Sequence, residues 1–561
     1  MNKNRLMGKL IMFEQDADSY YEKAIAAAED ENYLSALHYA RRVADVDQYS
    51  DDAYMLTAEI YAEMGLFHRA VSQYFKILAL DEGAADCYIA IGQNYYMMGA
   101  NIPALNFIKR GIDCACDSEY LIQARAMLDE ISEGPRFRLV SAEQNHEFLL
   151  SMAKSLMADN DFESAGRLLN FVPEDSGNYC EAVLQSAICS RYNKDYERSK
   201  ELTLKALETE PGNVIARCNY AGLLLDAGDA ANGEAELDAL ESDTGCGASE
   251  LYCIAITMLD AERENTAARF FEKFLALEPY SENVLMLLGQ VYYNLGDLDA
   301  AQNCMLTVLS IDPESIVARY YNKYFQSARK RRKPKLRYSR QIPSAAANKL
   351  LAELWKTGRM SDDALTAYID EKRDFFDTVL WMYKINRLAL AELVSLRLAV
   401  LPDRQVSAFL RLCLADTGIS NMVKKSILTA ILKSAPPNRL ALVVDDDIRF
   451  LSSGTPKILA DADYVIKSAY CSVFAATAFI AGGFERKLNA MLKRFFKEFS
   501  GLLYRFDSAP ELACVFAYRL GGSYFSDKIT ELAGIFNADE KLLKYYLELT
   551  GVDVNALFKT E

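Results

Sequence analysis

The chain has 561 residues, of which 51% are hydrophobic and 25% are charged, and its formal net charge is −17. This length exceeds what one hydrophobic core supports, so we expect several domains or an array of repeats, and the scarcity of proline predicts an all-α fold. The negative charge repels phosphate backbones and argues against a generally basic nucleic-acid-binding protein.

Residues 1–16 are expected to be a lead-in without a secretory signal, because Lys9 and Glu14 interrupt and close their apolar stretch. The longest uncharged run, Ser468–Phe484, is too short and too weakly hydrophobic for a membrane span, so it predicts a buried helix. The 12 cysteines contain no CxxC pair, which argues against a zinc site. Many of them lie in an apolar helical context, which favours reduced structural thiols and a cytoplasmic location.

Small residues recur every 34 positions over more than half of the chain. Two helices pack closely only where a small side chain lets their backbones approach, so each helical hairpin needs such a residue at the same place. In the first series, the recurring positions are Ala24, Ala58 and Gly92, followed by Ala36, Ala70 and Ala104. In the second, they are Ala153, Ala187, Ala221, Ala255 and Gly289, followed by Ala165, Ser199, Gly233, Ala267 and Ala301.

These units resemble the tetratricopeptide repeat family, as in Tyr54-Ala58-Tyr61-Gly65-Ala70-Tyr74 and Leu285-Gly289-Tyr292-Gly296-Ala301-Met305-Pro313. The resemblance implies an α-α superhelix. Three repeats are expected in residues 17–118 and five in residues 146–314. Residues 119–145 break the period with one helix and the stop signal Gly134-Pro135.

In this family the first helix of each repeat lines a concave groove through its second, fifth, ninth, twelfth and thirteenth positions. In the first sub-array, these positions are rich in carboxylates and hold no cation, which implies a basic or helix-N-terminal partner segment. The predicted partner-binding residues are Asp18, Tyr21, Asp52, Met55, Glu59, Glu63, Asp86, Ile89 and Tyr96.

The same positions of the second sub-array form a largely apolar wall suited to an amphipathic helix or an extended peptide. The alternative is that part of this wall packs against the C-terminal region or a second copy of the chain, which leaves a homo-oligomer open. The residues are Leu150, Lys154, Leu184, Ile188, Arg191, Tyr192, Tyr252, Ile256, Met286 and Tyr293.

Residues 315–340 are expected to form a capping helix, Ser315–Ala328, and a basic linker with a proline that prevents helix. The linker is interpreted as a solvated connection, or as an anchor for an acidic partner surface or nucleic acid. Its basic patch consists of Arg329, Lys330, Arg331, Arg332, Lys333 and Lys335.

Residues 341–561 are expected to form an irregular helical domain without the 34-residue period. Leu440–Val444 and Ile448–Leu451 flank three aspartates and could form a short hairpin. We predict no metal site at these aspartates, because neighbouring strand side chains point to opposite faces. The apolar spacing predicts helices over Ala346–Trp355, Ser361–Phe376, Thr378–Val400, Gln405–Leu414 and Asn421–Ser434.

The tail, Ile529–Leu549, resembles a helix-turn-helix with Ala533 at the close approach. A DNA-binding version would carry basic, amide or hydroxyl side chains on the exposed face of the second helix. Here that helix offers Lys541, Lys544 and Glu548 with two tyrosines and no arginine. A structural helical pair is the favoured interpretation.

The three histidines lie at unrelated positions, and no phosphate-binding glycine motif occurs. We therefore predict no enzyme activity, no cofactor, no metal, no membrane span and no specific duplex binding. The predicted function is a scaffold or adaptor that binds peptide or helical segments of other proteins. The alternative is a repeat-containing transcriptional regulator whose tail binds DNA.

Overall fold

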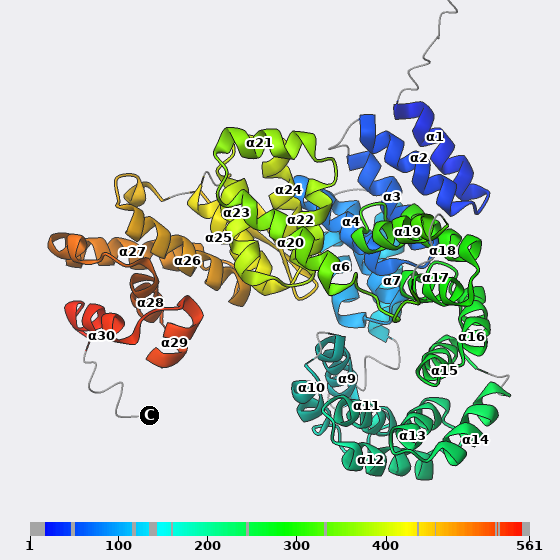
Figure 1. Ribbon diagram of the computed structural model, residues 1–561. Helices are drawn as coiled ribbons and strands as arrows, with labels where there is room; N and C mark the ends of the chain where they lie inside the picture. The colour runs from blue at the N-terminus through cyan, green and yellow to red at the C-terminus, as the bar shows by residue number, and fades with distance from the viewer. Residues whose placement is uncertain are drawn as a thin grey trace, which may run out of the picture. The chain divides into compact units, whose positions relative to one another are not determined.

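Helices make up nearly all of the regular structure, which confirms the predicted all-α class. The helices belong to two compact units, Met1–Ala124 with Pro343–Glu561 (unit 1) and Arg125–Ile342 (unit 2). Figure 1 shows the chain. The computed structural model describes residues 17–46, 51–114, 119–133, 143–158, 161–242, 246–329, 334–434, 437–454, 456–521, 524–525 and 528–552.

Unit 1 begins with consecutive helical hairpins, in which each helix packs on the next. The rings of Tyr88 and Tyr95 stack on Phe107 in the core of the third hairpin. Helix α7 (Glu119–Glu133) follows the hairpins and crosses from unit 1 into unit 2. The pairs are α1 (Ala17–Glu29) with α2 (Tyr33–Val46), α3 (Asp51–Glu63) with α4 (Phe67–Leu80), and α5 (Ala85–Met97) with α6 (Asn101–Cys114).

Unit 2 continues the hairpins as an arc, with the first helices on its inner side and the second helices on its outer side (Figure 1). Helix α19 (Ile316–Ala328) packs on the last hairpin. The pairs are α9 (Glu143–Ala158) with α10 (Phe162–Leu169), α11 (Tyr179–Tyr192) with α12 (Tyr196–Thr209), α13 (Val214–Asp226) with α14 (Ala230–Glu241), α15 (Ala248–Asp260) with α16 (Glu264–Leu277), and α17 (Glu282–Leu295) with α18 (Leu298–Ile311).

Recurring small residues set how closely the two helices of a hairpin approach. A Cβ added to Gly289 would lie 2.8 Å from Met305 Cε and 3.2 Å from the carbonyl oxygen of Ala301. At Gly92, it would lie 2.5 Å from Cγ1 of the isoleucine at position 108 on the partner helix. The period in the sequence therefore marks the helix–helix contact itself.

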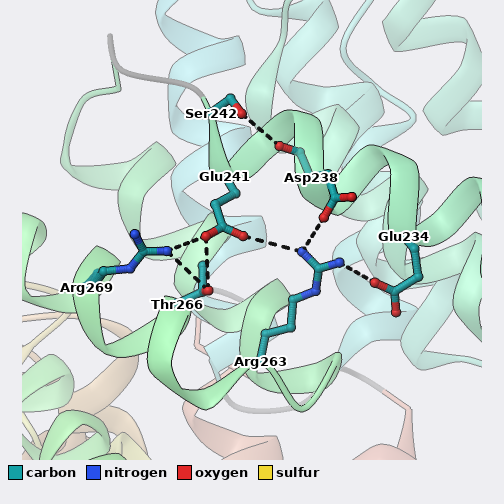
Figure 2. Close-up of polar contacts among 7 residues, drawn as sticks. All are labelled: Glu234, Asp238, Glu241, Ser242, Arg263, Thr266 and Arg269. Carbon is teal, nitrogen blue, oxygen red and sulfur yellow. Dashed lines mark hydrogen bonds and ion pairs between the residues drawn. The ribbon is translucent and has the colours of Figure 1, made fainter.

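Charged side chains join two neighbouring hairpins of unit 2 (Figure 2). Arg263 precedes α16 and pairs with Glu234, with Asp238 at 2.8 Å and with Glu241 at 3.5 Å, all on α14. Arg269 of α16 also pairs with Glu241. Burial tends to lower the pKa of Arg263, but the hydrogen bonds to Glu234 and Asp238 outweigh burial and raise this pKa. The network fixes the spacing of two successive hairpins.

The rest of unit 1 is helical, except for one β-hairpin. Helix α26 lies among α25 and α28, and α29 and α30 both pack on α28. Two 3₁₀ turns, η1 (Lys457–Leu459) and η2 (Ser500–Arg505), join neighbouring elements. The helices are α20 (Ser344–Thr357), α21 (Asp362–Glu371), α22 (Phe375–Lys384), α23 (Leu388–Ala399), α24 (Arg404–Ala415), α25 (Asn421–Lys433), α26 (Tyr464–Ile480), α27 (Glu485–Phe499), α28 (Ala509–Leu520), α29 (Ile529–Phe536) and α30 (Glu540–Leu549).

Two helix predictions in this region were wrong in extent. The helix expected over Ser361–Phe376 ends at Glu371, and the helix expected over Thr378–Val400 is divided between α22 and α23. Asn386 has a φ of 57°, in the left-handed region that terminates a helix and that asparagine tolerates. Apolar spacing continues across this turn, so periodicity alone did not reveal it.

The expected hairpin is confirmed as β1 (Arg439–Val444) and β2 (Asp447–Ser452), the only strands among the described residues. They pair antiparallel, with Val444 opposite Asp447. The intervening Asp445 and Asp446 have φ of 49° and 61°, as a two-residue type I′ turn requires.

The hairpin docks on the second and third helical pairs. Asp447 forms an ion pair of 2.7 Å with Arg110 of α6, and Arg439 forms one of 2.5 Å with Glu82. Tyr95 donates a hydrogen bond of 3.3 Å to the carbonyl oxygen of Asp446. These aspartates therefore hold the turn and its docking site together.

The tail is packed into unit 1 as the expected pair of helices. Asn537 adopts a left-handed conformation between α29 and α30, with φ of 55°. Tyr546 is fully buried, and its hydroxyl contacts Asp507, so only Tyr545 of the two tyrosines is exposed. Helix α26 is largely buried, as predicted, and no helix of the described residues has the length and apolar character to cross a bilayer.

Candidate functional site

The inner face of unit 2 holds an extended segment of the chain itself. Residues 334–341, here called the strap, follow α19 without regular secondary structure. Leu336 is held by Asn294 and Ser339 by Gln290, so the strap runs antiparallel to α17. The inner face thus binds a polypeptide in an extended conformation.

The two amide side chains bind the strap's backbone, and Asn294 also donates a hydrogen bond of 3.0 Å to the hydroxyl of Tyr338. Asn294 accepts a hydrogen bond of 2.7 Å from the amide of Leu336 and donates one of 2.9 Å to its carbonyl oxygen. Gln290 does the same to Ser339, at 2.9 and 2.7 Å. An amide side chain offers one acceptor and one donor group, which matches both polar groups of an extended residue. Gln290 is fully buried, so its orientation is fixed.

Tyrosine hydroxyls hold both ends of the strap. Tyr293 and Tyr324 donate hydrogen bonds of 3.1 and 3.3 Å to the carbonyl oxygen of Pro334. Tyr321 donates one of 2.9 Å to the carbonyl oxygen of Gln341. The rings of Tyr293 and Tyr324 contact each other edge to face, so they form one rigid wall.

Two strap side chains converge on Glu264. Tyr338 donates a hydrogen bond of 2.6 Å and Lys335 an ion-paired one of 3.1 Å to this carboxylate. Burial tends to raise the pKa of Glu264, but the bonds from Tyr338 and Lys335 outweigh burial and leave the pKa below its ordinary value. Burial and the same contact raise the pKa of Tyr338. Glu264 therefore binds a cation and a hydroxyl that lie three residues apart in the strap.

Beyond the strap, the inner face carries carboxylates on α13 and α15. Arg191 pairs with Asp226 at 2.9 Å and lies over Gly222, where an added Cβ would approach its Nη1 to 2.7 Å. Burial raises the pKa of Asp260; the Arg191 guanidinium opposes this rise and the Asp226 carboxylate adds to it. The half-buried Tyr252 and Ile256 lie on the same helix as Asp260.

A family model described as tetratricopeptide repeat matches residues 258–322, which include α16, α17 and α18. The chain contains tetratricopeptide repeats. No curated protein matches it.

Several solved tetratricopeptide structures are similar to the chain. The TPR domain of P58(IPK) is 15% identical with a TM-score of 0.24, covering 56% of this chain and 99% of that one. A tetratricopeptide repeat protein from Parabacteroides merdae is 17% identical with a TM-score of 0.25, covering 48% and 97%. The TPR2AB domain of yeast Sti1, in a complex with pHSP90, is 12% identical with a TM-score of 0.21, covering 46% and 96%.

The tetratricopeptide positions predicted in the second sub-array differ in exposure. Ile188, Tyr252 and Ile256 are half-buried, and Arg191 is engaged by Asp226. Lys154 pairs with Glu181 at 2.7 Å. Tyr192 is exposed and stacks on Phe162. The positions buried in unit 2 are Leu150, Leu184, Met286 and Tyr293.

The residues that hold the strap are not among the predicted partner-binding residues, apart from Tyr293. Gln290 and Asn294 occupy the ninth and thirteenth positions of the last repeat, so the family pattern itself pointed to them. They were passed over because the face was interpreted as an apolar wall. Glu264 and Tyr338 contact each other across 74 residues of sequence, so no periodic pattern marks either of them.

The basic linker, interpreted as a solvated connection or as an anchor for an acidic partner surface or nucleic acid, contacts carboxylates of its own array. Arg329 pairs with Asp299, and Lys335 pairs with Glu264 of the same tetratricopeptide array. Hydrogen bonds from the array hold the following strap residues in place. Lys330, Arg331, Arg332 and Lys333 lie outside the described residues.

In the first sub-array, side chains from neighbouring repeats share one electrostatic environment. Burial raises the pKa of Tyr21, and the nearby carboxylates of Glu59 and Asp52 raise it further. Met55 and Tyr96 are half-buried, and Ile89 is buried. The exposed carboxylates at the predicted positions are Asp18, Asp52, Glu59, Glu63 and Asp86.

Proposed function

We propose that this protein is a non-enzymatic scaffold that binds segments of other proteins on the inner faces of its tetratricopeptide arrays. The paired amide contacts of Asn294 with Leu336 and of Gln290 with Ser339 carry the proposal. They bind the peptide backbone, which every polypeptide ligand offers, while the surrounding side chains select among ligands.

A photo-cross-linking experiment tests whether partners bind the inner face. A photoreactive phenylalanine analogue replaces Ile256, which is half-buried on α15, or Glu208, which is exposed on the outer helix α12. The proposal predicts cross-links to defined protein segments from position 256 that are absent from position 208. Equal yields of the same products from both positions would show that the inner face has no privileged role.

The first sub-array supports a second binding surface of the same kind. Its carboxylates at Asp52 and Glu59 lie close enough to raise the pKa of Tyr21 together, although they come from one helix and Tyr21 from another. Such a surface favours a basic segment or a helix N-terminus. Because exposed ion pairs are worth about 0–1 kcal/mol each, the carboxylates would select partners and apolar contacts would supply most of the affinity.

Charge reversal tests this second surface. The double substitution of Glu59→Lys and Glu63→Lys is expected to abolish capture of partners that depend on residues 17–114, with the circular dichroism spectrum unchanged. The matched control reverses two exposed acids at other positions, Asp30→Lys and Asp113→Lys. A set of captured proteins identical for both double variants would leave this surface without a binding role.

We further propose a cytoplasmic location. The cysteines at positions 87, 218, 304 and 514 are buried as thiols in apolar cores, which suits a reducing compartment. The DNA-binding alternative remains a prediction. The burial of Tyr546 removes one of the side chains it needs on the second helix of the tail.

A further inference from the structure

The strap occupies its site with features of an exchangeable ligand. Its residues Leu336, Tyr338 and Ser339 are half-buried, whereas Pro334, Lys335, Arg337, Arg340 and Gln341 are exposed. Most of its contacts are hydrogen bonds, which contribute little net free energy because water replaces them on release. Little apolar area therefore opposes dissociation of the strap.

The inner face extends past the strap. At Arg340, the strap turns toward α19, where Tyr321 binds the carbonyl oxygen of Gln341. The side chain of Arg340 lies near Tyr252 of α15 and lowers the pKa of that tyrosine, which burial nevertheless raises overall. Asp260 lies on α15 in the position that Asn294 occupies on α17, so it offers an acceptor for a cation or an amide.

Tethering sets what a competing partner must provide. A flexibly linked segment acts at an effective concentration of about millimolar, so a free peptide that makes only the strap's contacts binds weakly to the intact chain. A partner segment longer than the strap gains further contacts with Tyr252, Ile256 and Asp260, which the strap's backbone does not contact.

We propose that the inner face over α15 and α17 is a binding site for an extended segment of a partner protein. Like the strap, this segment carries a cation followed three residues later by a tyrosine, and it carries a second cation opposite Asp260. The strap is the internal occupant of the α17 end of this site. This inference rests on the proposed function and adds the partner's chemical class. The complementary charges are Glu264 and Asp260.

Binding of a defined peptide tests the inference. The probe is a fluorescent peptide with the sequence of residues 329–342, measured by anisotropy at physiological ionic strength. The host is the full chain with Leu336→Gly and Tyr338→Ala, two changes outside the helices that weaken the strap. This variant is expected to bind the peptide at least tenfold more tightly than the unmodified chain. Equal affinity for both chains would overturn the proposal.

Two controls separate site binding from nonspecific attraction to an acidic protein. Adding Asn294→Ala and Gln290→Ala to the weakened-strap chain is expected to reduce affinity at least tenfold. A peptide whose lysines and arginines are replaced by glutamate is expected not to bind. Unchanged affinity in the Asn294→Ala, Gln290→Ala chain would overturn the assignment of the site.

Hydrogen exchange provides a measurement that does not depend on a weakened strap. In the unmodified chain, the amides of Leu336 and Ser339 are expected to exchange slowly, and a saturating extended peptide should accelerate both. A concentration-dependent dimer that is lost when the strap is weakened would show that the strap binds the inner face of a second copy of the chain. This result would overturn the proposal. Failure of peptide binding with retained cross-links at position 256 would leave the scaffold function intact and remove only this inference.

Discussion

Single residues fix the geometry of the arrays and of the C-terminal core. Gly289 sits where α17 meets α18, with backbone and side-chain atoms within 3.2 Å of any added Cβ. Lys424 sits fully inside unit 1 and donates a hydrogen bond of 2.8 Å to the carbonyl oxygen of Val443. The role of Gly289 is predictable from the 34-residue period. The burial of Lys424 is not, because nothing in the local sequence distinguishes a buried lysine from an exposed one.

Replacing Gly289 should destabilise the array. Gly289→Val places a branched side chain against Met305 and the carbonyl oxygen of Ala301, so we expect a loss of about 1–3 kcal/mol from overpacking. Urea unfolding followed by circular dichroism measures this loss. Gly212→Val, in a turn with no atom near an added Cβ, is the control and is expected to change stability by about 0.5 kcal/mol or less. Equal losses at both sites would contradict the close approach.

Lys424 should make stability depend on pH. Burial lowers the pKa of Lys424 to about 8, despite the opposing carboxylates of Asp416, Asp446 and Asp445. Its ordinary pKa is about 10.4, so between these values the unfolded chain binds a proton that the folded chain does not. The free energy of unfolding therefore rises with pH across this window, by about 3 kcal/mol at most.

The comparison of Lys424→Met with the unmodified chain isolates this contribution. The stability of the unmodified chain relative to the variant is expected to increase from pH 8 to pH 10, as measured by urea midpoints at each pH. Lys457→Met, at an exposed position, provides the control and should show no such trend. A pH-independent difference for Lys424→Met would show that the lysine keeps its charge on folding.

At the scale of elements, periodicity predicted the helical hairpins well because each repeat's core demands the same small residues. It failed at Asn386, where a left-handed residue ends α22 while the apolar spacing continues. It also gave no sign of the strap, because an extended segment has no periodicity and its partners come from α16, α17 and α19. Long-range side-chain contacts decide such features.

The ion pairs between α14 and α16 should stabilise the junction of two repeats. Arg263 is partly buried and pairs with three carboxylates, so Arg263→Met leaves these like charges close together and is expected to cost about 1–3 kcal/mol. The matched control is Arg198→Met, which removes an exposed pair within one helix and should cost no more than about 0.5 kcal/mol. Similar urea midpoints for the two variants would rule out a structural role for the network.

At the scale of the whole molecule, the two units differ in how the chain builds them. Unit 2 is one continuous segment, whereas unit 1 combines two segments distant in sequence. In unit 1, α24 and the hairpin pack on α4, and Arg110, Glu82 and Tyr95 contact hairpin residues. The sequence period could not show this second packing, since the C-terminal region has no repeat to match.

The continuous unit should therefore fold without the rest of the chain. Repeats contact mainly their neighbours, so residues 143–342 retain their core, the capping helix α19 and the strap. We expect this fragment to be helical, to unfold cooperatively in urea, and to protect the amides of Leu336 and Ser339 from hydrogen exchange. Residues 17–124, which lose the contacts of Arg110 and Tyr95, should unfold at lower urea than the same residues in the full chain. A fragment 143–342 that is unfolded, or folded with rapid exchange at both amides, would show that the strap site depends on unit 1.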